Sequence, residues 1–111
     1  MAAQGSAKGP TGAVDFGYLE GFAAGDRQVI SQVLALFVQQ AGLWANALDA
    51  AGPDWRDVVH TIKGAARGVG AHALGDACAE AEATGEGGLP AVRAALDAAV
   101  ADIAAYQARQ G

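Results

Sequence analysis

The chain has 111 residues, of which 52% are hydrophobic, 6% aromatic and 17% charged, and its formal net charge is −5. This length suffices for one domain with its own core, and the acidic charge argues against a general nucleic-acid-binding protein. No apolar run reaches the ~18 residues of a membrane span, and the single cysteine, Cys78, excludes an internal disulfide and predicts a cytoplasmic protein.

The N-terminal half is expected to hold two helices. Residues 1–13 (MAAQGSAKGPTGA) lack the apolar centre of a signal peptide and predict a flexible lead-in to one domain over residues 14–111. A short helix is expected over residues 15–22, with Asp15 as its cap. Asp26 suits the N-cap of a second helix that runs to about Ala51. Its predicted buried stripe recurs at alternating spacings of four and three: Ile30, Leu34, Phe37, Ala41, Trp44 and Leu48.

Three further helices are predicted in the rest of the chain. Pro53 suits the first position of a third helix that reaches about Gly68, with Gly70 as a left-handed cap. Apolar stripes then mark a fourth helix (Leu74, Ala77, Cys78, Ala81) and a fifth that ends near Ala108 (Leu89, Val92, Leu96, Val100, Ile103). With 29 alanines, the best helix former, the chain is predicted to be all-α: an up-down four-helix bundle with an additional short N-terminal helix.

The third helix places its polar residues on one exposed face. Each residue turns an α-helix by about 100°, so the buried stripe occupies a sector of about 80°: Trp55, Val59, Ile62, Ala66 and Val69. His60 lies about 140° from the middle of that sector and is expected to point to solvent. Four neighbours lie within about 60° of His60: Arg56, Lys63, Gly64 and Arg67.

This face is suited to phosphoryl chemistry. An imidazole nitrogen is largely unprotonated near neutral pH and is therefore nucleophilic, while Lys63 and Arg67 provide cations for a phosphoryl group. Glycine costs about 1 kcal/mol in a helix interior, so Gly64 indicates that an uncovered surface matters beside His60. No phosphate-binding loop and no carboxylate set for Mg²⁺ occurs in the sequence. Another protein must therefore bring the phosphoryl group and the metal.

The run HTIKGAARGVGAHAL, followed by Cys78 and Glu82, closely resembles the signature of the histidine phosphotransfer (HPt) domain family. The core of that signature is His-x-x-Lys-Gly followed by a short run to a glycine, which His60, Lys63, Gly64 and Gly70 match. The resemblance covers about residues 15–108. The chain departs from many members at three positions, where it has Ile62, Ala65 and Ala66.

The resemblance implies a helical bundle that relays phosphoryl groups between a histidine and receiver-domain aspartates. It implies that His60 is phosphorylated through Nε2, with Lys63 nearby, and that Gly64 gives the receiver access. The expected partners are response-regulator receiver domains and a hybrid histidine kinase. The chain itself is then a phosphoryl carrier and not an autonomous kinase, without a cofactor or metal, because Mg²⁺ is supplied at the receiver. A monomer is expected, because the predicted apolar stripes can be satisfied within one bundle.

Other functions fit parts of the sequence. The same motif occurs in the phosphoacceptor module of chemotaxis-type kinases. The dimerisation helix of a sensor kinase is disfavoured, because Thr61 stands where an acidic residue usually follows the histidine. A non-catalytic helical adaptor would use the basic face to bind an acidic partner. A metal- or haem-binding bundle is a weak alternative, since only His60 and His72, twelve residues apart, are available.

Overall fold

Helices account for most of the chain. The computed structural model describes residues 13–110, and these contain helices and turns but no strand. The helices are α1 (Phe16–Phe22), α2 (Arg27–Ala50), α3 (Trp55–Val69), α4 (His72–Thr84), the short 3₁₀ helix η2 (Glu86–Gly88) and α5 (Leu89–Gln110). The all-α prediction is confirmed. The lead-in predicted for residues 1–13 lies, apart from Ala13, outside the described residues.

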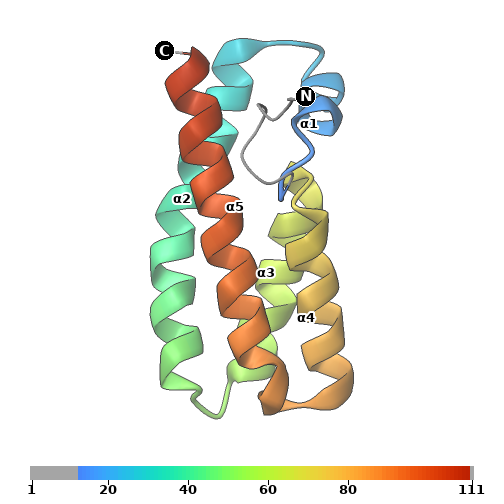
Figure 1. Cartoon of the computed structure of the whole chain (residues 1–111), viewed down its shortest axis with the longest axis vertical. Helices are drawn as coiled ribbons and strands as arrows, with labels where there is room; N and C mark the ends of the chain where they lie inside the picture. The colour runs from blue at the N-terminus through green and yellow to red at the C-terminus, as the bar shows by residue number, and fades with distance from the viewer. Residues whose placement is uncertain (1–12, 111) are drawn as a thin grey trace, which may run out of the picture.

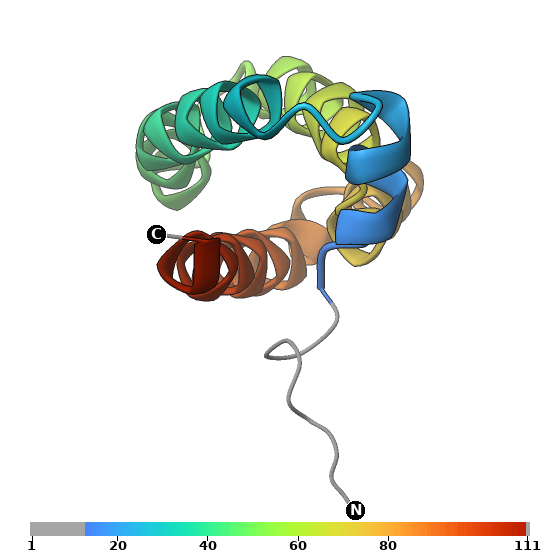
Figure 2. The ribbon, with the colours of Figure 1, turned by 90° about the horizontal axis from the view of Figure 1, so that it is seen from above.

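The four long helices run alternately up and down, with α1 at one end (Figure 1). Viewed along the bundle, they follow one another in chain order around its axis (Figure 2). Each therefore packs against two neighbours, and α3 contacts α2 and α4 but lies diagonally across from α5. The short connections dictate this arrangement, because they join antiparallel neighbours. Within residues 13–110, no helix is both long and apolar enough to cross a membrane.

Two of the predicted helix starts are confirmed and one is shifted. The Asp15 carboxylate accepts from the Tyr18 backbone N–H (3.0 Å), and Asp26 caps α2 in the same way. The prediction that Pro53 occupies the first position of the third helix is wrong, because α3 begins at Trp55. Pro53 instead lies in a turn closed by the Trp55 N–H, which donates to the Gly52 carbonyl oxygen (3.0 Å).

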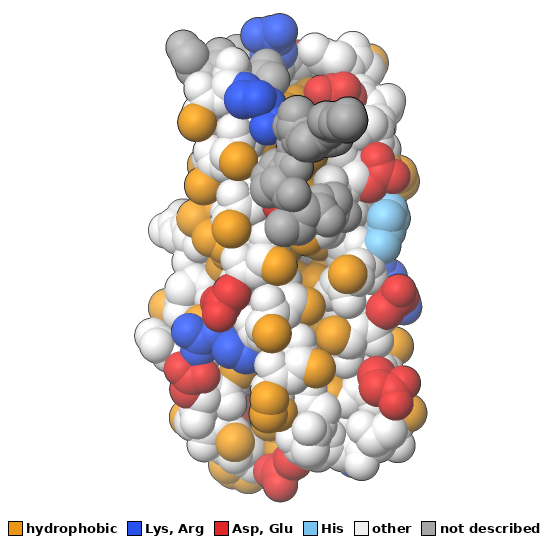
Figure 3. All heavy atoms as spheres, in the orientation of Figure 1, with side chains coloured by type: hydrophobic (Ala, Val, Ile, Leu, Met, Phe, Trp, Pro, Cys, Tyr) orange, Lys and Arg blue, Asp and Glu red, His pale blue; other side chains and the backbone are white. Residues whose placement is uncertain are grey.

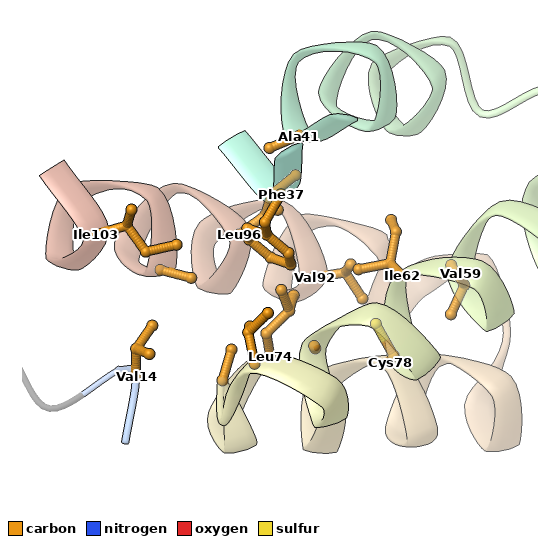
Figure 4. Packing of buried hydrophobic residues seen from close by; sticks show 14 of the residues in the cluster. Val14, Phe37, Ala41, Val59, Ile62, Leu74, Cys78, Val92, Leu96 and Ile103 are labelled. Carbon is orange, nitrogen blue, oxygen red and sulfur yellow. The ribbon is translucent and has the colours of Figure 1, made fainter. Parts of the chain in front are cut away.

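The predicted stripes meet in one core (Figure 4). All five residues predicted for the buried face of α3 are at most 8% exposed, so the angular assignment of that helix is confirmed. Trp44, Ala77 and Val100 are only partly buried and line the edge of the core. The largest fully buried side chains of the four long helices are aliphatic: Leu34, Ile62, Leu74, Leu96 and Ile103.

The turn between α3 and α4 holds the start of α1. Gly70 ends α3 in the left-handed conformation (φ 84°), and its carbonyl oxygen accepts from the Asp15 N–H (2.8 Å). A Cβ atom at Gly70 would lie 2.7 Å from the Asp15 carbonyl oxygen. Nearby, the fully buried Asp102 of α5 accepts from the Val14 N–H (3.1 Å), a contact that the sequence did not predict. These contacts fix the N-terminal segment against both sides of the bundle.

The surface over α2 and α5 is mostly apolar and uncharged (Figure 3). Between these two helices, Arg93 of α5 binds Asp49 of α2 and Asp97 of its own helix. Arg93 also donates to the Ala45 carbonyl oxygen (3.3 Å), so one guanidinium joins α2 to α5. These contacts are explained by helix packing and provide no nucleophile.

Cys78 is expected to be chemically inert in the folded protein. Its side chain is fully buried, and burial, with a smaller contribution from the Glu82 carboxylate, raises the pKa of the thiol to about 11. A thiol with that pKa is only about 0.1% thiolate at pH 8. We expect iodoacetamide to modify the native protein at pH 8 at least about 100-fold more slowly than the same protein in guanidinium chloride. Similar rates, measured by mass spectrometry over time, would contradict this burial.

Candidate functional site

His60 lies on the outer face of α3, one turn into the helix, and its side chain is 74% exposed. The exposure follows from the helix geometry, because the residues that turn inward on either side, Val59 and Ile62, are fully buried. The imidazole is therefore fixed to a rigid helix at the backbone while its ring faces solvent. A partner can reach it without any rearrangement of the bundle.

One ring nitrogen of His60 is held by α4. Nδ1 lies 3.2 Å from Oε2 of Glu82. An ionised carboxylate only accepts hydrogen bonds, so Nδ1 carries the proton and the lone pair of the neutral ring is on Nε2. The hydrogen bond also fixes the orientation of the ring. The contact thus selects the tautomer in which the free lone pair is on Nε2, on the far side of the ring from Glu82.

Lys63 binds the other oxygen of the same carboxylate. Its ammonium group donates to Oε1 of Glu82, and its side chain is only 19% exposed. The hydrogen bond from Lys63, and secondarily that from His60, keep the pKa of Glu82 below its ordinary value. The carboxylate is therefore ionised at neutral pH and remains an acceptor for the His60 ring.

Gly64 leaves a gap one turn beyond His60. A Cβ atom built there would meet no other atom within 4 Å, so a larger side chain would fit the fold and project into solvent. The glycine is not needed for packing or for an unusual backbone conformation. Its effect is to leave open space on the helix surface one turn from the imidazole.

Arg67 follows two turns after His60 and leans toward α4. A Cβ atom at the buried Gly75 would lie 3.2–3.8 Å from Cγ, Nε and Cδ of Arg67, so the arginine stem crosses α4 at this glycine. Arg56, the remaining neighbour of His60 on this face, donates to the Glu82 carbonyl oxygen (3.0 Å), and its guanidinium lies over the Trp55 ring (4.5 Å). Arg56 therefore joins the start of α3 to the end of α4.

The sequence did not predict the role of α4 in the site. Glu82 stood out only as part of the family pattern, and Gly75 did not stand out at all. The spacing of Glu82 and Gly75 could have indicated this role. In two antiparallel helices, residues seven apart on one lie opposite residues seven apart on the other, so His60 faces Glu82 and Arg67 faces Gly75. Using that spacing requires the register of the two helices, which the sequence did not provide.

Together these groups form a nucleophile with an oriented ring, a fixed counter-charge and open access. The described residues contain no group of three or more His, Cys, Asp or Glu side chains placed to hold a metal ion. His72, the other histidine, lies at the start of α4, with Nε2 3.6 Å from Asp15 and its ring edge-on to Tyr18. It belongs to the contacts that hold α1 and not to the His60 site.

Known proteins are similar to this chain in sequence and in fold. The protein-family model described as "Hpt domain" matches residues 23–109, which include α2, α3, α4 and all but the last residue of α5. The chain is also similar to the crystal structure of histidine phosphotransferase ShpA from Caulobacter crescentus, with 62% sequence identity and a TM-score of 0.83. That match covers 89% of this chain and 94% of the other. No curated protein matches the chain significantly.

Proposed function

Because the chain belongs to the Hpt domain family, we propose that it accepts a phosphoryl group on His60 from a receiver-domain aspartate and passes it to another receiver. The observation that carries this proposal is the exposed imidazole whose Nδ1 is held by Glu82. Hpt proteins are phosphoryl carriers in phosphorelays, and we expect this chain to carry phosphoryl groups and not to act as a kinase. The expected donors and acceptors are response-regulator receivers, including that of a hybrid histidine kinase.

The transfer step requires no proton to leave the histidine. The Nε2 lone pair of His60 attacks the phosphorus of the aspartyl phosphate, the bond between phosphorus and the carboxylate oxygen breaks, and the aspartate leaves as a carboxylate. The ring then carries phosphorus on Nε2 and a proton on Nδ1, and so bears a positive charge. The Glu82 carboxylate next to Nδ1 stabilises that charge. The return step to a second receiver reverses the same sequence.

Lys63 acts mainly through Glu82. Its side chain is 19% exposed, and its ammonium group is hydrogen-bonded to that carboxylate, which it holds in place and in the ionised form. Lys63 is therefore a positioning residue for the His60 ring, and its remaining N–H groups are available to a phosphoryl oxygen on Nε2. Mg²⁺ is expected to be supplied at the receiver, and the chain to act as a monomer.

A transfer assay tests the proposal. Receiver domains from the same organism are phosphorylated with labelled acetyl phosphate and Mg²⁺, purified and mixed with the chain. We expect at least one receiver to transfer label to the chain, and the label to be stable in alkali and lost in acid, as a phosphoramidate is. Binding of a receiver without any transfer of label would instead support the adaptor function, in which the basic face only docks an acidic partner.

Replacing Gly64 with glutamine is expected to slow transfer at least about tenfold while leaving the fold intact. The new side chain fits without collision but projects beside His60, where the receiver must approach. Because glycine is a poor helix former, the same change should raise the free energy of unfolding by roughly 0.5–1 kcal/mol. Single-turnover transfer rates and urea unfolding measure the two effects.

Gly68 provides a matched control for this variant. It is also an exposed glycine of α3 at which an added Cβ would meet no atom within 4 Å, but it lies about 12 Å along the axis from His60. Gly68→Gln should give a similar gain in stability with a much smaller loss of transfer rate. Equal transfer rates for Gly64→Gln and the unmodified chain would show that Gly64 does not provide access.

A further inference from the structure

We propose that Arg67 is a docking residue that binds an acidic group on the receiver surface beside the phosphorylated aspartate, and does not contact the phosphoryl group on His60. This inference rests on the proposed function, since it specifies how the partner of that site is recognised. It assigns to Arg67 an effect on association, and leaves the transfer step to His60, Glu82 and Lys63.

The first observation is that Arg67, unlike the other two cations of α3, has no hydrogen-bond, ion-pair or aromatic partner among residues 13–110. Lys63 binds Glu82, and Arg56 binds the Glu82 carbonyl oxygen and the Trp55 ring. Arg67 is exposed and makes no hydrogen bond or ion pair with any residue between 13 and 110. Its guanidinium, with five donors, is therefore available to an anionic group from outside the chain.

The second observation is that the side chain of Arg67 is held in place although its charge is unpaired. Its stem lies against the bare backbone of Gly75, where a Cβ atom would come within 3.2 Å of Cγ. An arginine supported along its stem loses less rotamer freedom on binding than one that extends into solvent. The missing side chain at Gly75 thus positions the guanidinium on the surface shared by α3 and α4.

The third observation is the separation between Arg67 and the reacting atom. Arg67 is seven residues after His60, which places the two on one side of α3 but about 10 Å apart along its axis. The stem of Arg67 also runs sideways to Gly75 and not back along α3 toward His60. A receiver that presents its aspartyl phosphate to Nε2 must cover this part of the surface. The group that meets Arg67 is therefore on the rim of the interface, and a cation there favours an acidic one.

A purely structural role predicts a different outcome. Arg67 lies in the last turn of α3, where a cation stabilises the helix C-terminus. In that case its removal would lower stability slightly and leave the kinetics of transfer unchanged. Kinetic constants for the receiver therefore separate the two roles.

The experiment measures transfer from a labelled phosphoreceiver to the chain at varied receiver concentration and ionic strength. For Arg67→Gln we expect KM to rise about five- to tenfold with kcat unchanged, and kcat/KM to fall less steeply with salt than in the unmodified chain. Gly75→Ala keeps the charge but displaces the stem, so it should raise KM by a smaller factor. Arg109→Gln is the charge-matched control on α5, diagonally across from α3, and should change neither constant (Figure 2).

The possible outcomes distinguish this inference from the proposed function. An unmodified chain that takes up no label from any receiver would overturn the proposed function, and the docking role with it. Normal transfer with an unchanged KM in Arg67→Gln would overturn the docking role alone. A lower kcat at unchanged KM would also overturn it, because Arg67 would then act on the phosphoryl group.

Discussion

Replacing His60 with glutamine is expected to abolish phosphoryl uptake, with a loss of at least about 1000-fold in transfer rate. The amide nitrogen of glutamine has no available lone pair for attack on phosphorus, and no other nucleophile occupies the site. Because His60 is largely exposed and, among residues 13–110, its ring makes one polar contact, with Glu82, the fold should remain intact. The helical circular dichroism signal and the unfolding midpoint of the variant should therefore match those of the unmodified chain.

His72 is the control for this prediction. His72 is also an exposed helical histidine, and its ring also lies beside a carboxylate, that of Asp15. His72→Gln should take up label at the normal rate, since this histidine is involved in the contacts of α1. Equal labelling of the His60→Gln variant would reject His60 as the phosphoacceptor. Loss of labelling in His72→Gln alone would identify His72, at the start of α4, as the phosphoacceptor instead.

Replacing Gly70 with alanine is expected to destabilise the protein by about 3 kcal/mol. The left-handed conformation of Gly70 (φ 84°) costs an alanine about 1–2 kcal/mol. The new Cβ would also lie 2.7 Å from the Asp15 carbonyl oxygen, so the backbone of the N-terminal segment must move. That movement threatens the hydrogen bond from the Asp15 N–H to Gly70, which contributes about 1 kcal/mol.

Gly25 separates the two causes of this loss. Its φ of 75° is close to that of Gly70, but a Cβ atom there would meet nothing within 4 Å. Gly25→Ala should therefore cost only the conformational part, about 1–2 kcal/mol. Urea unfolding monitored by circular dichroism gives both values. Equal losses in the two variants would show that the contact between Gly70 and Asp15 does not contribute.

The fold could be predicted from the sequence because its signals are local. The inward positions of α3 repeat with the helical period, and this alone placed Val59 and Ile62 in the core and His60 in solvent. Asp15 and Asp26 are capping residues whose hydrogen bonds reach only two or three residues along the chain. The error at Pro53 has the same origin, since proline also suits the second position of a turn.

The site could be predicted only in part, because half of it belongs to another helix. The exposed face of α3 follows from angles within one helix, and Gly64 is unusual enough in an alanine-rich chain to be noticed. The contacts of Glu82 with His60 and Lys63 depend on the register between α3 and α4, which is set by the turn at Gly70. No local pattern reports that register. The tautomer of His60 could therefore not be predicted from the residues of α3 alone.

The most direct measurement identifies the nitrogen that carries phosphorus. The chain is labelled by a phosphorylated receiver. One portion is hydrolysed in alkali, and the two phosphohistidine isomers are separated by chromatography. In another portion, the labelled peptide is identified by mass spectrometry after proteolysis. Since Glu82 keeps the proton on Nδ1, we predict only the Nε2 isomer, and only at His60. The Nδ1 isomer, or label on any other residue, would contradict this mechanism.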